Sequence, residues 1–498
     1  MNFHRVVVRL ATCFSIFAFF CVLNVLGQNS VPRFEASDCA VPIPNGETVK
    51  CGYLIVPESR KIKNDKTIRL PIVILKSKNP SPQPDPILRT FGGPGSSSMN
   101  LVRSRPSSPW LRDRDLIIFE QRGTKYAQPA LECPEVNEAN LNSVTTELDV
   151  AAARGNEIEA AKICYQRLLK QGNNLAAYNS AESAADIEDL RRVLKLDKIS
   201  LWGVSYSSRL ILNVMRDYPN GIRAVVLESP LPPEVNYDEV GVDAIVNALN
   251  QVFKNCAVDG ECAKAYPNLE SEFYEVVGKL NKKPISASVK DETTGKTNEL
   301  KLDGNDFVTW IVDYLLSVDA SAIADVPLVV NQAFQGNYEV FKRYAKAKLG
   351  PRGGLGMRYS VWCSEEVPFE NMQKIKAQSF RYSRLNGYEV MTLPDICRVW
   401  KVPAAKQIEN KPIRSDVPTM ILTAEYDAYT PSAWGQLIAR NLKNSFLFEV
   451  PWAGHGPAFS TPCAREMIAN FFDNPKSAPN SSCLDKIRKD YDFKVKKN

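Results

Sequence analysis

The sequence KISLWGVSYSS, residues 198–208, joins a short apolar run to a Gly-x-Ser-x-Ser motif, and a helical pattern continues through Tyr218. A strand, a tight turn and a helix in this order lift a serine hydroxyl above the end of a sheet, at the positive end of the helix. Ser207 stands two places after Ser205, where this motif usually has glycine, but serine is small enough for a close approach of helix and strand. The motif predicts that Ser205 is a nucleophile; an ordinary strand-to-helix turn is the alternative.

Short apolar runs rich in β-branched and aromatic residues recur along the chain. Eight of them lie at about residues 50–56, 68–75, 86–91, 116–119, 199–202, 224–227, 420–423 and 445–450. The first two are joined by a polar stretch short enough for a hairpin, whereas several later runs alternate with helical patterns such as residues 184–196. Strands that alternate with helices pair in parallel. We therefore expect an α/β fold with a mostly parallel, eight-stranded sheet.

The pattern changes to long amphipathic helices between residues 230 and 395, for example at 242–253, 307–316 and 326–349. The Pro-rich segment 229–233 marks the start of this region, and residues 401–403 lie near its end. These features predict a helical cap inserted into the sheet domain. The expected order is a sheet domain at 28–229 and 396–475, a cap at 230–395, and a tail at 476–498 whose basic end is solvated.

A serine nucleophile needs a base, and the histidines of the chain are His4 and His455. A single histidine is more often structural, but His455 lies in the Gly-rich segment WAGHGP after the last predicted strand, which favours catalysis. Asp427 follows the preceding predicted strand, where an acid would orient the imidazole. Glu425 is the alternative acid, but its place immediately after the strand favours a solvent-facing or supporting role. The order Ser205, Asp427, His455 is that of the α/β-hydrolase fold.

Acyl transfer to a serine also needs N–H groups that stabilise the negative charge on the carbonyl oxygen, and loss of one such donor costs roughly 3 to 4 kcal/mol. The segment FGGPG, residues 91–95, directly follows the third predicted strand, where the first donor belongs. A Gly-Pro-rich turn is common by itself, but this one precedes a matching motif at Ser205. We expect the backbone N–H groups of Gly93 and Tyr206 to form the oxyanion hole.

The first 27 residues are distinct, with Arg5 and Arg9 around an apolar stretch that ends at Leu26. This is the pattern of a secretory signal peptide, with cleavage expected before Gln28; a retained membrane anchor is the alternative. Beyond this segment there is no long uncharged apolar run, so no stable membrane span is expected after cleavage. Loss of Arg5 and Arg9 lowers the formal charge from +6 to +4. That charge is too small and too dispersed to indicate a nucleic-acid partner.

Ten cysteines remain after residue 27, an even number that indicates five disulfides in an exported protein. The simplest connectivity joins sequential pairs: Cys39–Cys51, Cys133–Cys164, Cys256–Cys262, Cys363–Cys397 and Cys463–Cys483. Metal binding is the alternative, but no CxxC spacing occurs and His455 is the one histidine after residue 27. Neither a metal nor an organic cofactor is expected.

The phrases FGGPG, DLIIFEQRGT, GVSYSS with the following Arg209, TAEYDAYTP and AGHG resemble those of the proline iminopeptidase and tripeptidyl aminopeptidase group of α/β-hydrolases. The resemblance covers most of the chain after residue 27, and the segment 463–483 is similar to the tripeptidyl aminopeptidase branch. Phe91 replaces the usual histidine and Glu120 the usual aspartate, and neither belongs to the expected triad. The resemblance implies an α/β-hydrolase fold with a helical cap, and release of residues or short peptides from free N-termini.

An aminopeptidase must bind the ammonium group of its substrate, and carboxylates from or near the cap can supply that contact. Glu365 and Glu366 are the first candidates, because the expected disulfide at Cys363 would hold them near the return of the cap. Glu228 is the second choice. The sequence thus predicts a secreted serine exopeptidase for a peptide or small acyl substrate. A small-ester hydrolase of the same fold and a non-catalytic binding protein are the alternatives.

Overall fold

The computed structural model describes residues 31–495 except 64–65, 105–108, 147, 291–294, 318, 386–387, 389–392 and 460. The expected signal segment, residues 1–27, lies outside these residues. Among the described helices, none is long and apolar enough to cross a membrane.

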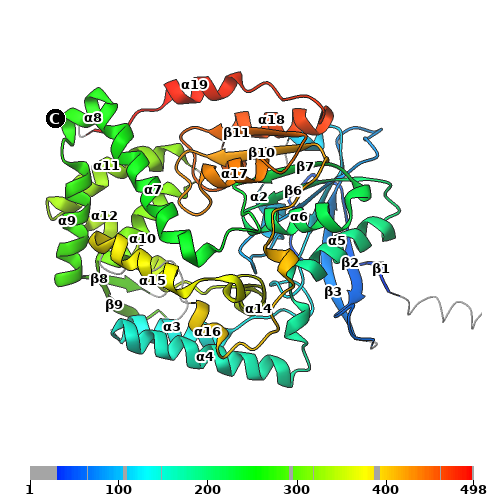
Figure 1. The fold of residues 1–498 in the computed structure, drawn as a ribbon, viewed down its shortest axis with the longest axis horizontal. Helices are drawn as coiled ribbons and strands as arrows, with labels where there is room; N and C mark the ends of the chain where they lie inside the picture. The colour runs from blue at the N-terminus through cyan, green and yellow to red at the C-terminus, as the bar shows by residue number, and fades with distance from the viewer. Residues whose placement is uncertain are drawn as a thin grey trace, which may run out of the picture.

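Nine strands form one mixed sheet (Figure 1). They are β1 (Arg33–Ala36), β2 (Val49–Pro57), β3 (Thr67–Leu75), β4 (Ile87–Thr90), β5 (Leu116–Phe119), β6 (Ile199–Val204), β7 (Ile222–Glu228), β10 (Thr419–Ala424) and β11 (Ser445–Val450). The order is β1-β2-β3-β5-β4-β6-β7-β10-β11. The neighbours β1, β2, β3 and β5 pair antiparallel, and the remaining pairs of the sheet are parallel. All eight predicted strands are present, which confirms the fold class; the sequence analysis missed only β1 of this sheet, a four-residue edge strand.

Helices cover both faces of the sheet. One face carries α5 (Ser180–Val193), α6 (Tyr206–Asp217) and α17 (Ser432–Ala439), and the other carries α2 (Asn100–Ser104) and α18 (Pro462–Asp473). Every residue of β6 and β10 is buried, as expected of parallel strands that are covered on both sides. Because parallel strands end at the same edge, the loops after β4, β6, β10 and β11 meet there.

The chain between β7 and β10 forms the cap, at the left of Figure 1. Its elements are α7 (Tyr237–Val258), α8 (Gly260–Ala265), α9 (Leu269–Lys282), β8 (Ile285–Lys290), β9 (Thr297–Leu302), α10 (Gly304–Leu315), α11 (Ala320–Phe334), α12 (Glu339–Lys342), α13 (Ala345–Lys348), α14 (Leu355–Glu365), α15 (Met372–Arg381) and α16 (Leu393–Cys397). The predicted single helix at 326–349 is wrong. Gly336, with φ of +85°, ends α11 there, because that backbone conformation cannot continue a right-handed helix.

The antiparallel hairpin of β8 and β9 was not predicted. Its residues alternate between buried and exposed, and the segments ISASVK and TNELKL carry that alternation in weak form. The alternation of strands and helices that predicts a parallel sheet gives no signal for two short antiparallel strands that pair with each other.

Two helices from the predicted sheet domain also pack against the cap. These are α3 (Pro134–Thr145) and α4 (Val150–Lys170), which lie beside α14 and α16 in Figure 1. One hydrophobic cluster joins Leu168 on α4 to Tyr359 and Trp362 on α14 and to Ile396 on α16. In space, residues 134–170 therefore extend the cap, although they precede β6 in the chain.

Five disulfides join the ten cysteines in the sequential pairs described above. Three of them, Cys133–Cys164, Cys256–Cys262 and Cys363–Cys397, cross-link elements of the cap region. Such a set of structural disulfides is typical of extracytoplasmic proteins.

The C-terminal segment contains a helix whose side chains are partly or fully exposed. Helix α19 (Ser482–Asp490) runs along the edge of the molecule from the sheet domain toward α8 (Figure 1). Beyond it, the ring of Phe493 packs against Trp452 with 4.9 Å between ring centroids. The N–H of Lys494 donates to the carbonyl of Ala324 on α11 at 2.9 Å. Residues 482–495 therefore form a strap from the sheet domain to the cap, and we call them the C-terminal strap.

Candidate active site

Ser205 forms the turn between β6 and α6 and is the N-cap residue of that helix. Its φ of +60° and ψ of −133° lie outside the regions that L-residues favour. The N–H of Ser205 donates to the carbonyl of Glu228 at 3.0 Å, which ties this turn to the end of β7. Ser205 is partly exposed while its neighbours in sequence are buried. A strained residue held this way is typical of a nucleophile presented above a sheet.

Ser207 replaces the usual glycine of the motif without disturbing the turn. Its hydroxyl accepts a hydrogen bond from the N–H of Val204 at 2.8 Å and lies 3.0 Å from the carbonyl oxygen of Thr90. The close approach of helix and strand occurs instead at Gly203, where a Cβ would lie 2.6 Å from the carbonyl oxygen of Ser207. The serine side chain thus bridges β4 and β6.

His455 follows β11, and its Nδ1 lies 2.9 Å from Oδ2 of Asp427. Asp427 is buried and accepts hydrogen bonds from the N–H groups of Tyr429 and Thr430, each at 2.9 Å. The hydroxyl of Thr430 also donates to this carboxylate at 2.8 Å. These bonds hold the carboxylate in one orientation. With Nδ1 engaged, Nε2 is the ring nitrogen left for a serine hydroxyl.

His455 and Asp427 shift each other's pKa. Burial disfavours the imidazolium, but the charge and hydrogen bond of Asp427 and the charge of Glu228 outweigh it and raise the pKa of His455 above its ordinary 6.5. Burial alone would raise the pKa of Asp427, but the charge of His455 and the hydrogen bonds hold it below its ordinary 3.8. The pair therefore favours an imidazolium beside a carboxylate, the state that forms when the imidazole accepts a proton.

Glu425, the alternative acid, is occupied elsewhere. Its carboxylate accepts hydrogen bonds from Nδ2 of Asn255 at 3.0 Å and from the N–H of Trp452 at 3.1 Å. These contacts connect helix α7 of the cap to the loop that carries His455. Glu425 therefore has the supporting role that its position in sequence favoured.

The segment FGGPG lies against the turn at Ser205. A Cβ on Gly92 would lie 2.7 Å from the carbonyl oxygen of Val204 and 2.8 Å from Cβ of Ser205. Gly93, with φ of +116°, lines the same cavity as Tyr206. Within the part of the chain that the structure describes, the N–H groups of Gly93 and Tyr206 donate to no protein acceptor. Both N–H groups are therefore free to bind an oxyanion.

Glu120 holds the loop that follows FGGPG. Its buried carboxylate accepts hydrogen bonds from the N–H of Ser98 at 2.7 Å and from the hydroxyl of Ser97 at 3.0 Å. Burial raises the pKa of Glu120, and the hydrogen bonds oppose that effect. The replacement of aspartate by glutamate in this phrase therefore leaves a carboxylate that positions the loop.

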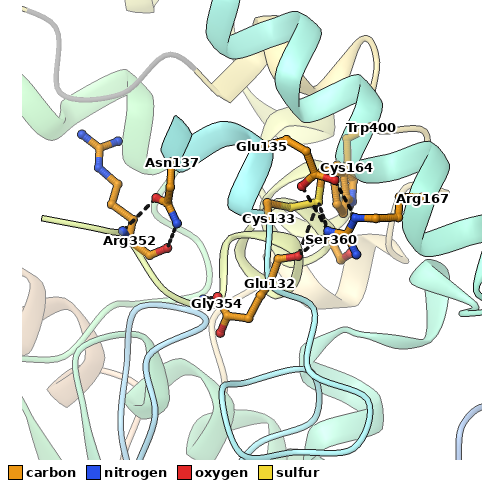
Figure 2. The surroundings of a disulfide bond; sticks show 10 residues. All are labelled: Glu132, Cys133, Glu135, Asn137, Cys164, Arg167, Arg352, Gly354, Ser360 and Trp400. Atoms are coloured by element: carbon orange, nitrogen blue, oxygen red, sulfur yellow. Dashed lines mark hydrogen bonds and ion pairs between the residues drawn. A yellow bond between two sulfur atoms is a disulfide. The ribbon is translucent and has the colours of Figure 1, made fainter. Parts of the chain in front are cut away.

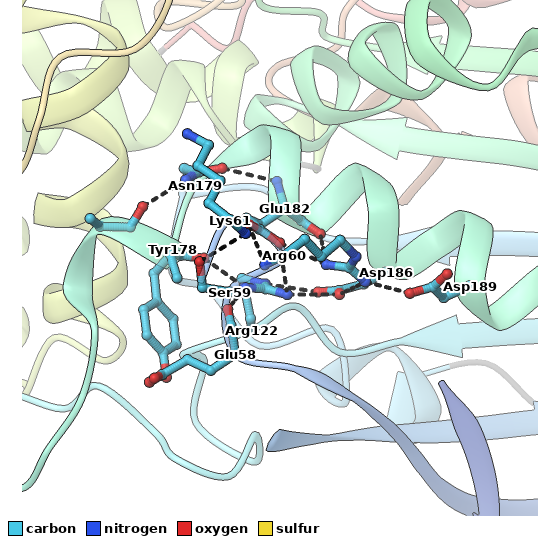
Figure 3. A network of polar contacts seen from close by, with 12 residues as sticks. Glu58, Ser59, Arg60, Lys61, Arg122, Tyr178, Asn179, Glu182, Asp186 and Asp189 are labelled. Carbon is cyan, nitrogen blue, oxygen red and sulfur yellow. Dashed lines mark hydrogen bonds and ion pairs between the residues drawn. The ribbon is translucent and has the colours of Figure 1, made fainter. Parts of the chain in front are cut away.

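Arg122 of the same phrase anchors α5 to the sheet (Figure 3). Its guanidinium binds both carboxylate oxygens of Asp186, at 2.8 and 2.7 Å, and donates to the carbonyls of Glu58 and Ala177. Arg60 binds the same Asp186 from the other side at 2.8 Å. Arg122 thus has a structural role at a distance from the cavity.

A cavity of about 290 Å³ lies over the turn at Ser205. Its lining consists of Phe91, Gly92, Gly93, Ser96, Ser205, Tyr206, Leu231, Tyr237, Arg358, Trp362, Tyr429, Thr430 and His455. The structure thus brings four of the predicted residues, Ser205, His455, Gly93 and Tyr206, to one cavity, and Asp427 lies directly behind His455. Among the described residues there is no cluster of metal-ligating side chains.

Glu365 and Glu366 do not line this cavity. The Glu365 carboxylate accepts hydrogen bonds from the N–H and the hydroxyl of Ser180, each at 2.6 Å. Glu366 forms an ion pair with Arg209 and accepts from the N–H of Tyr237 at 3.1 Å. Both side chains are about 1% exposed. The amine-binding role predicted for them disagrees with these positions, because they join α14 to the helices behind it.

Glu228 is likewise absent from the lining. Its carboxylate accepts hydrogen bonds from Nε1 of Trp202 at 2.9 Å and from the N–H of Ala458 at 2.6 Å. Ala458 lies three residues after His455. Glu228 therefore anchors the histidine loop, and the prediction that it binds a substrate amine disagrees with this position.

Residues 383–483 match the family of TAP-like proteins. The chain has the α/β-hydrolase fold, with a C-terminal region similar to TAP-like proteins. This serine hydrolase is 22% identical over 449 residues to the serine protease Hip1 of Mycobacterium tuberculosis, covering 83% of this chain and 82% of that protein. It is 26% identical over 207 residues to the tripeptidyl aminopeptidase of Streptomyces lividans, covering 39% and 38%. The proline iminopeptidase structure from Mycobacterium smegmatis shares 12% identity at a TM-score of 0.37, covering 85% and 98%.

Sequence analysis of this hydrolase missed the side chains that the cap contributes to the cavity. Arg358 and Trp362 lie one helical turn apart on α14, and Tyr237 lies at the start of α7. Buried apolar residues flank Arg358 and Trp362 in sequence, so nothing in the pattern separates these cavity residues from core residues. No role was predicted for Thr430 of the TAEYDAYTP phrase, although its hydroxyl donates a hydrogen bond to the carboxylate of Asp427.

Replacing Gly92 with alanine is expected to lower kcat/KM by roughly 100-fold or more, the cost of losing an oxyanion donor. The new Cβ would lie within 3.0 Å of Val204, Ser205 and Tyr206 atoms, so the loop must move away from the serine. Steady-state hydrolysis of 4-nitrophenyl acetate measures the loss. Gly278→Ala on α9 is the control, because a Cβ there meets no atom within 4 Å. Equal activity of the Gly92 and Gly278 variants would show that the loop tolerates the shift.

Proposed function

We propose that this serine hydrolase is an exported exopeptidase that releases residues or short peptides from free N-termini through an acyl-enzyme on Ser205. The observation that carries the proposal is the meeting of Ser205, His455 and the FGGPG loop around one cavity, with Asp427 hydrogen-bonded to the imidazole. The five disulfides support an exported location.

In the proposed mechanism, Nε2 of His455 takes the hydroxyl proton of Ser205 as the oxygen attacks the acyl carbon. Asp427 keeps the proton on Nδ1 and stabilises the imidazolium. The N–H groups of Gly93 and Tyr206 bind the oxyanion, and the positive end of α6 adds to that stabilisation. The imidazolium then gives its proton to the leaving amine, and water attacks the acyl-enzyme by the same path. The electron pair of the broken C–N bond leaves with the amine.

The size of the cavity supports small substrates. About 290 Å³ is near the lower end of ligand pockets, which range from about 300 to 1,000 Å³. A space of this size holds a few residues of an extended peptide or a small acyl group. It does not hold a loop of a folded protein, so exopeptidase action agrees with it better than endoproteolysis.

A small-ester hydrolase is the second candidate, and the composition of the cavity favours it. Among the described residues that line the cavity there is no aspartate or glutamate, whereas an aminopeptidase binds the substrate ammonium group with a carboxylate. An ester substrate has no such requirement, and the same serine, histidine and oxyanion donors would cleave it.

Hydrolysis of a fluorogenic Ala-Ala-Pro amide with a free amine, compared with the N-acetylated peptide, separates the two functions. The exopeptidase proposal predicts that cleavage of the free peptide exceeds that of the acetylated peptide by tenfold or more, the effect of one charge-assisted contact worth roughly 1.5–3 kcal/mol. Ser205→Ala supplies the blank. Equal cleavage of both peptides would reject amine recognition. Cleavage of neither, with retained hydrolysis of 4-nitrophenyl acetate, would favour the esterase.

A further inference from the structure

Arg358 lines the cavity together with His455, and among the described residues of the lining there is no other arginine and no lysine. It lies on α14, on the cap side of a cavity that Ser205 and His455 also line. The other described cap residues there are Leu231, Tyr237 and Trp362, all of them buried and two of them aromatic. The Arg358 guanidinium carbon lies 5.4 Å from the centroid of the Trp362 ring. The cation thus lies near an aromatic ring that lines the same cavity.

The segment that leads into α14 is fixed to the elements around it (Figure 2). Asn137 on α3 makes two hydrogen bonds with the backbone of Arg352, at 2.9 and 3.0 Å. The N–H of Gly354 donates to the carboxylate of Glu132 at 2.9 Å. The Cys133–Cys164 disulfide joins this region to α4.

Gly354 also connects Arg358 to the oxyanion loop. A Cβ on Gly95 would lie 2.4 Å from the carbonyl oxygen of Gly354, so the two backbones touch. The same carbonyl accepts the N–H of Arg358 at 3.0 Å, in the first turn of α14. At the far end of the helix, Glu366 forms an ion pair with Arg209. The position of Arg358 relative to Ser205 is therefore set at both ends of α14.

The surroundings of the guanidinium favour an anion. Burial lowers the pKa of Arg358, and the charge of Arg352 acts in the same direction, while Tyr237, Tyr359 and Tyr429 oppose the shift. An arginine stays protonated in proteins. In such a place, a planar carboxylate can form two parallel hydrogen bonds with the guanidinium, and the low polarity of the walls strengthens them.

We propose that Arg358 binds a carboxylate of the substrate, so that this hydrolase prefers short substrates with a negative charge close to the scissile bond. In a peptide, that carboxylate belongs either to the C-terminus of a very short chain or to an acidic side chain. The inference rests on the proposed acyl transfer at Ser205, and it holds for an amide or an ester bond.

Matched substrates test the proposal in the purified enzyme. Ala-Ala-Ala against Ala-Ala-Ala-amide probes the C-terminal carboxylate. Tripeptide amides with one glutamate at each position, against the same peptides with glutamine, probe the side chain. Product formation is followed by mass spectrometry. In at least one pair, we expect kcat/KM to favour the carboxylate roughly tenfold to a hundredfold. The pair that shows the preference identifies the source.

Two variants locate the effect. In Arg358→Gln the preference is expected to fall to about twofold or less, and Arg358→Lys should retain part of it, because an ammonium lacks the planar fork. Arg352→Gln removes a positive charge from the same segment outside the cavity and should keep the wild-type preference. Equal rates for charged and neutral partners in the wild-type enzyme would overturn the proposal, whether or not the variants fold. A preference that survives in Arg358→Gln would also overturn it.

An ester pair separates this proposal from the peptidase proposal. 4-Nitrophenyl hydrogen adipate carries a free carboxylate, and 4-nitrophenyl methyl adipate is its neutral partner. If no peptide is cleaved but the acid ester is preferred in the wild type and not in Arg358→Gln, peptidase activity is rejected and the role of Arg358 stands. If peptides are cleaved without regard to charge, the peptidase proposal stands and the role of Arg358 is rejected.

Discussion

The Ser205→Ala variant is expected to lose covalent labelling by a fluorophosphonate probe and about a millionfold of its kcat, the loss seen when a serine nucleophile is removed. The variant keeps the cavity and the oxyanion donors but has no oxygen to form the acyl-enzyme. Labelling followed by peptide mapping checks the site, and hydrolysis of 4-nitrophenyl acetate checks the rate. The small side chain of alanine fits the turn, although the φ of +60° at this position is unfavourable for both residues.

Ser271→Ala is the matched control for this experiment. Ser271 is an exposed serine on α9, and its hydroxyl bonds only to the carbonyl of Asn268 in the adjoining turn. Its removal should leave labelling and kcat unchanged. Label on a peptide that lacks Ser205, or full activity of Ser205→Ala, would show that another residue is the nucleophile.

Asp427→Asn is expected to lower kcat by roughly 10⁴-fold, because an amide in place of the carboxylate favours the wrong imidazole tautomer. The pH profile supplies a second readout. The base must be neutral, so activity is lost as pH falls through the pKa of His455, which lies above 6.5 in the wild type chiefly because Asp427 opposes the effect of burial. Without that charge, the acidic limb of kcat/KM should move to lower pH, measured with a neutral ester between pH 5 and 9.

Glu425→Gln tests the alternative acid. Glu425 lies two residues before Asp427, and its carboxylate bonds to Asn255 and Trp452 instead of to His455. Glutamine keeps one accepting oxygen for these donors and leaves Asp427 and His455 untouched, so we expect kcat within a few-fold of wild type and an unchanged acidic limb. A loss in Glu425→Gln as large as in Asp427→Asn would show that Glu425 is the acid that supports the base.

The sheet and the residues at its edge could be predicted because their signals are local. Each predicted strand is recognised by its own run of apolar residues. Ser205, Asp427 and His455 each follow one of these strands, at the edge of the sheet where parallel strands end. The strain at Ser205 follows from the same strand, turn and helix. The pairing of the cysteines also followed from neighbouring positions in the chain.

The cap could not be predicted to the same depth because its signals depend on distant contacts. In the sequence, Glu365 and Glu366 are charged residues near a cysteine. Only the fold shows that the Glu365 carboxylate bonds to Ser180 and that the Glu366 carboxylate pairs with Arg209. Nothing in the sequence distinguishes Arg358 from another helical arginine. Its position over the cavity depends on contacts of Gly354 with Gly95 and Glu132, which lie more than 200 residues earlier in the chain. Most side chains of the C-terminal strap are solvated, as expected, but the docking of Phe493 was not predicted because a single ring among basic residues gives no sequence signal for a distant contact.

The C-terminal strap has a consequence for how molecules reach Ser205. The Cys463–Cys483 bond fastens the start of the strap to α18. At its other end, Lys494 holds the cap through the carbonyl of Ala324 and an ion pair of 2.9 Å with Asp325. Because of these contacts, the cap can move away from the sheet domain only after the contacts of Lys494 with Ala324 and Asp325 break. We therefore expect the cap to keep its position during turnover, so that substrate reaches Ser205 without a large closing motion of the cap.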